Sequence, residues 1–153
     1  MSFKRIMVPV DGSHTATKGM ETAIAMAKES GAALLLLHVV DEYPAFTATD
    51  MGVSSVPLIE ALMESGRETL AAIVEAARKA GVTPEYALVE NFGQRVADAI
   101  VEKAAGWKAD LIVMGTHGRR GFKRALLGSD ADLVVRYSPV PVLLVPPEGR
   151  TDR

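Results

Sequence analysis

The stretch ALLLLHVV, residues 33–40, is the clearest structural signal in this chain of 153 residues. Seven of its eight residues are apolar, which is too continuous for a strand with one wet face and too short for a membrane span. The stretch therefore predicts a β-strand buried on both faces, as in the parallel sheets of α/β proteins. His38 lies inside it, where we expect a core residue whose ring is hydrogen-bonded.

Four more strands and four helices are predicted around this one. Short apolar runs predict strands at 5–10 (RIMVPV), 85–90 (EYALVE), 110–115 (DLIVMG) and 140–145 (VPVLLV). Apolar residues repeat at helical spacing over 16–27, 58–77 and 96–104, and again after Gly128. Gly31 and Gly81 are typical of helix C-termini, and Ser65-Gly66 marks a weak point in the longest helix. The alternation predicts an α/β domain with a parallel sheet, in the order 3-2-1-4-5 or 2-1-3-4-5.

The composition narrows the classes of function that this chain can serve. It has 17 lysines and arginines against 19 aspartates and glutamates, a net charge of −2 that argues against nucleic acid as a partner. It contains no cysteine, which excludes disulfides and thiol catalysis. The N-terminal stretch lacks the apolar core of a signal peptide, so we expect a cytoplasmic protein with no membrane partner.

The segment 41–57, DEYPAFTATDMGVSSVP, has no periodicity of either kind. It is longer than the connections that compact domains usually leave without secondary structure. Three interpretations stay open: a lid over a site, a surface for a partner, and a disordered or merely connecting segment, of which the last is the simplest.

The carboxyl ends of two predicted strands carry the features of a ligand site. Open parallel sheets bind ligands beyond these ends, where the strand order reverses. In the order 3-2-1-4-5 the reversal lies between the strands that end in PVDGS (9–13) and MGTHG (114–118). Asp11 can accept hydrogen bonds from ribose hydroxyls there, although an Asx-turn or a helix cap explains the same residue without a ligand.

The segment MGTHGRRGFKRALLGSD (114–130) is rich in glycine and in positive charge. It matches neither the Walker A motif nor GxGxxG, and its pattern is Gly-x2-Gly-x9-Gly-Ser. Glycines let backbone amides approach phosphate oxygens, and Gly128-Ser129 would open a helix whose N-terminus attracts anions. We therefore expect an anion site. Two alternatives are a solvated basic surface and a capping box in which Ser129 and Asp132 engage the same amides.

The sequence carries little evidence for catalysis. Two of the three histidines, His14 and His117, lie on the loops of the expected site. Without cysteines or an HExxH motif, a metal centre is a minority interpretation. Ser13 lacks the GxSxG setting of a nucleophile, so His117 is the one evident candidate for a general base. We expect no catalytic residue and no metal ligand.

These segments together resemble the universal stress protein family, in its nucleotide-binding branch. The resemblance rests on KRIMVPVDGS (4–13), LLLLHVVDE (34–42) and GTHGRRGFKRALLGS (115–129), and it covers essentially the whole chain. It implies a Rossmann-like, three-layer α/β/α sandwich of the adenine nucleotide alpha hydrolase-like type, with a five-stranded parallel sheet in the order 3-2-1-4-5. It also implies a single domain over 1–146 that contains a variable loop at 41–57, and a C-terminal tail at 147–153.

The resemblance also implies a ligand, ATP or else ADP or AMP, accompanied by Mg²⁺. By position, Pro9, Asp11 and Val39 would border adenine and ribose, and Met114 and Gly115 would line the nucleoside and α-phosphate region. The phosphates would meet Gly118, Arg119, Gly128, Ser129 and Asp130, mostly through backbone amides. Asp130 departs from the family's pattern, which often has an apolar residue there, and an inward carboxylate would weaken triphosphate binding.

A homodimer, joined by antiparallel pairing of the last strands (Val140–Val145), is a further implication of the resemblance. The sequence supports it, because VPVLLV is apolar on both faces and carries no charge, and unprotected edges of that kind tend to pair. In the alternative, the C-terminal tail PPEGRTDR (146–153) covers this edge.

The resemblance implies a stress-response protein that acts as a nucleotide-responsive regulator or protectant rather than as an enzyme, with an unidentified protein partner. One alternative is a slow ATPase or an ATP pyrophosphatase, although DGSHT (11–15) lacks the phosphate loop that such pyrophosphatases carry after their first strand. The other alternative is a scaffold protein whose nucleotide site is vestigial and whose basic patch contacts an acidic partner.

Overall fold

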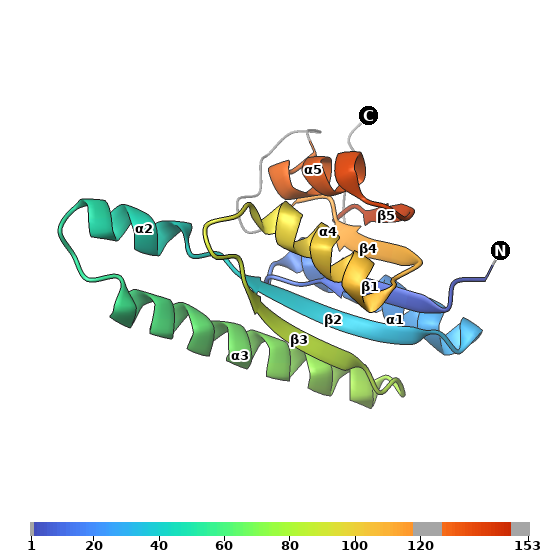
Figure 1. Ribbon diagram of the computed structural model, residues 1–153. Coiled ribbons are helices and arrows are strands. Elements are labelled where there is room, and N and C mark those ends of the chain that lie inside the picture. Colours follow the sequence, from blue (N-terminus) through green and yellow to red (C-terminus); the bar gives the residue numbers. More distant parts are fainter. Residues whose placement is uncertain (1, 118–126, 148–153) are drawn as a thin grey trace.

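A parallel sheet of five strands forms the middle layer of the protein (Figure 1). The computed structural model describes residues 2–117 and 127–147. The strands are β1 (Arg5–Pro9), β2 (Ala33–Val40), β3 (Glu85–Glu90), β4 (Leu111–Gly115) and β5 (Val142–Val145). Their order is β3-β2-β1-β4-β5 and all four pairings are parallel, which confirms the predicted fold class and strand order.

Helices cover both faces of this sheet. The helices of one face are α1 (His14–Ser30) and α3 (Val56–Lys79), and those of the other are α4 (Val96–Trp107) and α5 (Ser129–Tyr137). A fifth helix, α2 (Tyr43–Asp50), lies beyond the carboxyl end of β2, beside the start of α3 (Figure 1). No helix within the described residues is both long and apolar enough to span a lipid bilayer.

The two faces of β2 enter two separate hydrophobic clusters. Leu34 and Leu36 pack with side chains of α1 and α3, whereas Leu35 and Leu37 pack with side chains of α4 and α5. All four are at most 3% exposed, so burial on both faces is confirmed. Each such side chain contributes about 1.5–3 kcal/mol of transfer free energy, which explains why the run is almost continuously apolar.

Two predictions about the helices are wrong. Of the three interpretations of segment 41–57, the disordered or merely connecting one is wrong, because the segment contains α2 and the start of α3. Most apolar side chains of this segment are exposed, and α2 buries Ala45 alone, so it leaves no periodic signature. The weak point at Ser65-Gly66 is also absent, because α3 runs through it without a break.

The amino ends of the strands are joined by a set of long-range contacts, which we call the amino-end cluster. The carboxylate of Asp110 accepts from the backbone nitrogens of Lys4 and Arg5, at 2.7 and 2.9 Å. The guanidinium of Arg5 lies 4.0 Å from the ring centroid of Trp107, and its Nε donates to the Trp107 carbonyl oxygen. Trp107 Nε1 in turn donates to Glu85 Oε2 at 3.2 Å. This end of the sheet is therefore closed by side chains, and the glycine-bearing loops lie at the opposite end.

Candidate functional site

The carboxyl ends of β1 and β4 lie side by side, because these two strands pair in parallel with Ile6 opposite Leu111. After β1 the chain passes through α1 to β2 and then to β3 at one edge of the sheet. It returns through α4 to β4, which pairs with the edge of β1 opposite β2. The reversal of strand order therefore lies between β1 and β4. Ligands of open α/β sheets bind at such a reversal.

The helix α1 approaches the end of β4 so closely that only glycines fit between them. A Cβ atom on Gly115 would lie 2.6 Å from Thr15 Cγ2 and 2.7 Å from the Thr15 carbonyl carbon and oxygen. A Cβ atom on Gly19 would lie 3.2 Å from the backbone nitrogen of Gly115. Gly115 thus has a packing reason of its own, independent of any ligand.

The loop after β1 is a tight turn that begins α1. Asp11 Oδ1 accepts from the backbone nitrogen of Ser13 at 2.8 Å, and Gly12 between them has a φ of 80°. Ser13 is the N-cap residue of α1, and its Oγ accepts from the backbone nitrogen of Ala16 at 3.2 Å. The Asx-turn interpretation of Asp11 is confirmed for Oδ1, and its contact with a ribose stays a prediction.

The exit of β4 is bonded to the start of α5. The backbone nitrogen of Gly128 donates to the carbonyl oxygen of Thr116 at 2.8 Å, and the Thr116 nitrogen donates to Val145 on β5 at 3.2 Å. Gly128 is the N-cap residue of α5, so it offers no side-chain oxygen to the amides of the first turn. The helix therefore begins with backbone amides beside the glycine-bearing end of β4.

Ser129 and Asp132 do not form the capping box that was one of the two alternatives to an anion site. Ser129 is the first residue inside α5 rather than its N-cap, so its hydroxyl is one position too late. Asp132 instead pairs with Arg136 one turn further along the helix, with Oδ2 and Nε 3.1 Å apart. Asp130 is exposed in the first turn, where a carboxylate favours the helix dipole but competes with an anion.

The remaining predicted site residues lie near the same edge of the sheet. Pro9 ends β1 opposite Leu37, Val39 is the half-buried penultimate residue of β2, and Met114 is buried near the end of β4. Val39 and Met114 share the hydrophobic cluster on the α4 and α5 face. Gly118 and Arg119 lie outside the described residues.

The two described histidine rings are held differently. His38 is 7% exposed and its Nδ1 bonds the carbonyl oxygen of Val10 at 2.8 Å, which confirms it as a hydrogen-bonded core residue. His117 is 8% exposed and its Nδ1 bonds the neighbouring Thr116 Oγ1 at 2.9 Å. Its Nε2 is buried and has no hydrogen-bond partner within the described residues.

A buried acidic group joins the ends of β2 and β3, and the sequence did not predict it. Glu42 is 4% exposed, and its pKa is raised by burial and further by the nearby charge of Glu90. The side chain of Asn91 connects the two strand ends: its Oδ1 accepts from the Glu42 nitrogen and its Nδ2 donates to Asp41 Oδ1, both at 3.3 Å. No single segment carries a signal for it, because the residues meet only when the strands pair.

Metal binding finds no support in the described part of the chain. Residues 2–117 and 127–147 contain no group of three or more histidine, aspartate or glutamate side chains placed to hold an ion. The acidic residues near Glu42 therefore do not form a metal site.

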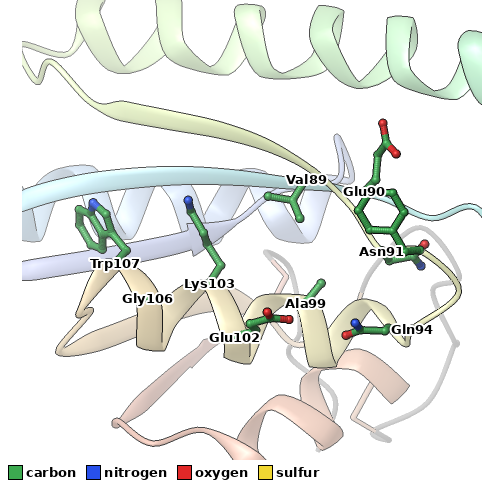
Figure 2. Close-up of a pocket in the computed structure, with 10 residues that line it drawn as sticks. Val89, Glu90, Asn91, Gln94, Ala99, Glu102, Lys103, Gly106 and Trp107 are labelled. Atoms are coloured by element: carbon green, nitrogen blue, oxygen red, sulfur yellow. The ribbon is translucent and has the colours of Figure 1, made fainter.

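A cavity of about 560 Å³ lies between α4 and the end of β3, away from the β1–β4 reversal (Figure 2). Trp107 and Lys103 lie at one end of it, and Asn91 and Gln94 at the other. None of the predicted site residues lines it. The cavity is therefore separate from the candidate site at the ends of β1 and β4.

The fold and the site edge define the chain as an open, doubly wound α/β protein with glycine-bearing strand ends at the reversal. The model of the universal stress protein family matches residues 2–146, and the chain belongs to this family. A universal stress protein of Methanocaldococcus jannaschii is 38% identical over 143 residues, which are 94% of this chain and 82% of the relative. One from Thermus aquaticus is 37% identical over 144 residues, which are 94% of this chain and 98% of the relative.

Solved structures of similar proteins share the fold over nearly the whole chain. A hypothetical protein whose biochemical function was assigned from its structure aligns over 100% of both chains, with a TM-score of 0.82 and 27% identity. The universal stress protein of Archaeoglobus fulgidus in complex with dAMP has a TM-score of 0.66 and 27% identity, over 95% of this chain and 99% of that one. A universal stress protein in complex with cAMP has a TM-score of 0.60 and 26% identity, over 95% and 98%.

Proposed function

We propose that this chain is a cytoplasmic adenine nucleotide-binding protein that acts in stress response as a nucleotide-responsive homodimer. Its ligand is ATP, or ADP or AMP, and any Mg²⁺ arrives as the counter-ion of the phosphates. One observation carries the proposal: the 2.8 Å bond from the Gly128 nitrogen to the Thr116 carbonyl oxygen. This bond joins the two glycine-bearing ends of the Gly-x2-Gly-x9-Gly-Ser segment beside the first amides of α5.

The described residues fit a phosphate at this position. The first turn of α5 offers backbone amides that its glycine N-cap does not cap, and helix N-termini attract anions. His117 follows Thr116 in the chain, and its buried Nε2, which has no hydrogen-bond partner among the described residues, is a polar atom that a ligand can satisfy. The complexes of two relatives with dAMP and cAMP support adenine as the base.

In this proposal each segment of the site has its own part. Pro9, Asp11 and Val39 border adenine and ribose, while Met114 and Gly115 line the nucleoside and the α-phosphate. The amides of Ser129 and Asp130, after Gly128, meet the phosphates. Gly118 and Arg119 would complete the phosphate contacts.

The proposed action is a change of stability and of partners rather than turnover. A ligand that binds only the folded state stabilises it by about 2.7 kcal/mol at a hundredfold excess over Kd. No catalytic residue is proposed. The enzymatic alternative predicts release of phosphate or pyrophosphate from ATP, with His117 as the candidate base. Equal release by wild type and His117→Ala would remove that role.

The proposed dimer uses the outer edge of β5. This strand pairs with β4 on one side, and Leu143 at its centre is 37% exposed. Like the rest of the strand it carries no charge, and uncharged apolar edges are prone to pair with another strand.

The first experiment asks whether the chain carries or binds an adenine nucleotide. The purified protein is denatured, and the supernatant is analysed by anion-exchange chromatography. The refolded or nucleotide-free protein is then titrated with ATP, ADP and AMP, following its melting temperature. We expect released nucleotide or a rise in melting temperature with at least one of the three. If no nucleotide is released and none of the three raises the melting temperature, the proposal is wrong.

Two variants of Asp11 locate the ribose. Asp11→Asn keeps an oxygen for the Ser13 amide, so the turn survives, but it removes the carboxylate that would accept from ribose hydroxyls. Asp11→Ala removes both. The 2′-hydroxyl is tested by comparing AMP with dAMP, which lacks it. We expect Asp11→Asn to weaken AMP more than dAMP, and equal weakening of both would place Asp11 away from that hydroxyl.

A further inference from the structure

The sheet has an open edge at β3, on the side opposite β5. Among the described strands β3 pairs with β2 alone, so its outer side has no neighbouring strand. The nitrogen of Asn91, directly after β3, donates to the Val40 carbonyl oxygen at the end of β2. Backbone groups of successive residues point to opposite sides of a strand, so those of Tyr86, Leu88 and Glu90 point to the open edge. An edge of this kind is a template for a further strand.

The cavity of about 560 Å³ lies beside this edge, on the face of the sheet that α4 covers (Figure 2). Val89 points from β3 toward α4, and Ala99 and Gly106 of α4 line the cavity as well. Volumes of about 300–1,000 Å³ are typical of binding pockets. A strand added to β3 would direct every second side chain to this face, beside Val89. The edge therefore offers hydrogen bonds and the cavity offers a pocket for a side chain, as in recognition by strand addition.

Apolar surface remains uncovered around this edge. Phe92, which follows β3 and lines the cavity, is 76% exposed. Its φ of 48° lies in the left-handed region, which bulky residues rarely adopt, and such outliers gather at binding sites. Ala87, Leu88 and Val89 are only half-buried, unlike the central residues of β2. An apolar side chain placed in the cavity would therefore gain contacts that the fold itself leaves unused.

The charges at this edge indicate which occupant fits it. Glu85 begins β3 and Glu90 ends it. Antiparallel pairing of two β3 strands in full register would place Glu85 of one copy opposite Glu90 of the other, and like charges in that position destabilise a sheet. Glu102 adds a further negative charge at the cavity, against the positive charge of Lys103. The edge therefore disfavours a second copy of itself and favours an extended segment with positive charge.

We propose that the edge of β3 and the cavity beside α4 bind an extended peptide segment of a partner protein, which joins the sheet as a further strand. The middle of this segment is apolar, with one side chain seated in the cavity, and lysine or arginine residues flank it. The cavity is separate from the reversal between β1 and β4, so this inference goes beyond the proposed function and does not depend on nucleotide binding.

The first test uses a displayed library of short random peptides, selected on the full-length wild-type protein. The tightest binder is synthesised in three forms: unmodified, and with one or the other alternate set of its backbone amides N-methylated. Only one set can face β3. We expect methylation of that set to weaken binding about tenfold or more, and methylation of the other set to have little effect. No binder, equal effects of the two sets, or a tightest binder flanked by acidic residues would overturn the inference.

The second test fills the cavity. Nothing lies within 4 Å of a Cβ atom on Gly106, so Gly106→Leu can fold and place its side chain in the cavity. The matched control is Ala105→Leu, an exposed position of the same helix that does not line the cavity. We expect Gly106→Leu to bind the selected peptide about tenfold more weakly and Ala105→Leu to bind it like wild type. Equal affinities of the two variants would place the peptide elsewhere, for example at β5, and would overturn the inference.

A third measurement uses the wild-type protein, so it does not depend on the folding of a variant. Hydrogen exchange followed by NMR reports the protection of each backbone amide with and without the selected peptide. We expect the amides of Tyr86 and Leu88 to exchange fast in the free protein and slowly in the complex. Those of Ala87 and Val89, which face β2, should be protected in both. Unchanged exchange at Tyr86 and Leu88 on binding would overturn the inference.

Discussion

Gly115 lies so close to Thr15 that a Cβ atom on Gly115 would lie 2.7 Å from the Thr15 carbonyl oxygen. The contact joins the last residue of β4 to the first turn of α1, at the edge of the sheet where the candidate site lies. The backbone of Thr15 cannot move away easily, because Thr15 lies in the first turn of α1 and Ser13 caps that turn.

We expect Gly115→Ala to lower the free energy of unfolding by about 1–3 kcal/mol, the usual cost of forcing an extra group into a packed interior. The new methyl group would push α1 away from β4 and should also weaken nucleotide binding. Urea denaturation gives the first effect and calorimetry the second. The matched control is Gly106→Ala in α4, where nothing lies within 4 Å of the new Cβ. There the change should be neutral or stabilising by up to about 1 kcal/mol. Equal stabilities of the two variants would contradict the steric account.

Gly66, inside α3, is a second glycine at which neighbouring atoms leave no space for a Cβ atom. Alanine is the better helix former, yet a Cβ there would lie 2.9 Å from His38 Cδ2 and from Leu88 Cδ1. His38 cannot turn away without giving up its bond to Val10. We therefore expect Gly66→Ala to lower the melting temperature by several degrees, against the helix propensity. A melting temperature equal to or above that of wild type would show that His38 and Leu88 can rearrange at little cost.

Glu42 should make stability depend on pH in a predictable direction. Its pKa is raised, mainly by burial and next by the charge of Glu90, with Asp41 adding to the effect. For a pKa above the unfolded value, the contribution to stability is fully present below the unfolded pKa. It is lost as the pH rises through the folded pKa. The ionised carboxylate therefore destabilises the protein at neutral pH.

Glu42→Gln should remove this penalty, because an amide of nearly the same shape carries no charge at this buried position. We expect the variant to be more stable than wild type at about pH 8, with a difference that shrinks toward about pH 4. Urea denaturation across this range measures it. Glu75→Gln, an exposed change on α3, serves as the control and should show no such trend. A constant difference at all pH values would refute the role of ionisation.

The dimer predicted at β5 can be tested at Leu143. Antiparallel pairing about a two-fold axis would bring the centres of two β5 strands together, and like charges placed opposite each other on paired strands repel. We expect Leu143→Lys to be monomeric where wild type is dimeric, by light scattering after size exclusion. The control is Tyr86→Lys on the opposite edge strand β3, where the side chain is 59% exposed. A monomeric wild type, or a dimer that Tyr86→Lys disrupts and Leu143→Lys does not, would contradict the proposal.

The three inner strands β1, β2 and β4 were predictable because burial on two faces makes a strand almost continuously apolar. The run 33–40 is β2 to the residue, and the other four strands differ from their predicted ranges by at most two residues at an end. The helix α2 escaped prediction because nearly all its apolar side chains face outward, so no stripe of buried residues marks it. Gly66 has a related explanation that no local pattern records, because His38 of β2 and Leu88 of β3 leave no space for a Cβ atom there.

The candidate site was predictable as an edge of the sheet but not as a set of contacts. Strand ends carrying glycine mark the edge, and the strand order confirms that the reversal lies between β1 and β4. The capping box failed because the boundary of α5 moved by one residue, and a one-residue shift exchanges an N-cap for an N1 position. The unsatisfied nitrogen of His117 and the Glu42–Asn91 contact depend on the packing of separate segments, which no local pattern records.

The amino-end cluster has a consequence for the order in which the protein can fold during synthesis. Lys4 and its acceptor Asp110 are 106 residues apart, and β1 lacks its second neighbour until β4 has been made. At roughly 5–20 residues per second, about 5 to 20 seconds pass between the emergence of the two ends. Once β2 has been made and until β4 follows, β1 has β2 alone as a partner strand, so a nascent chain shorter than about 110 residues leaves the other edge of β1 unpaired.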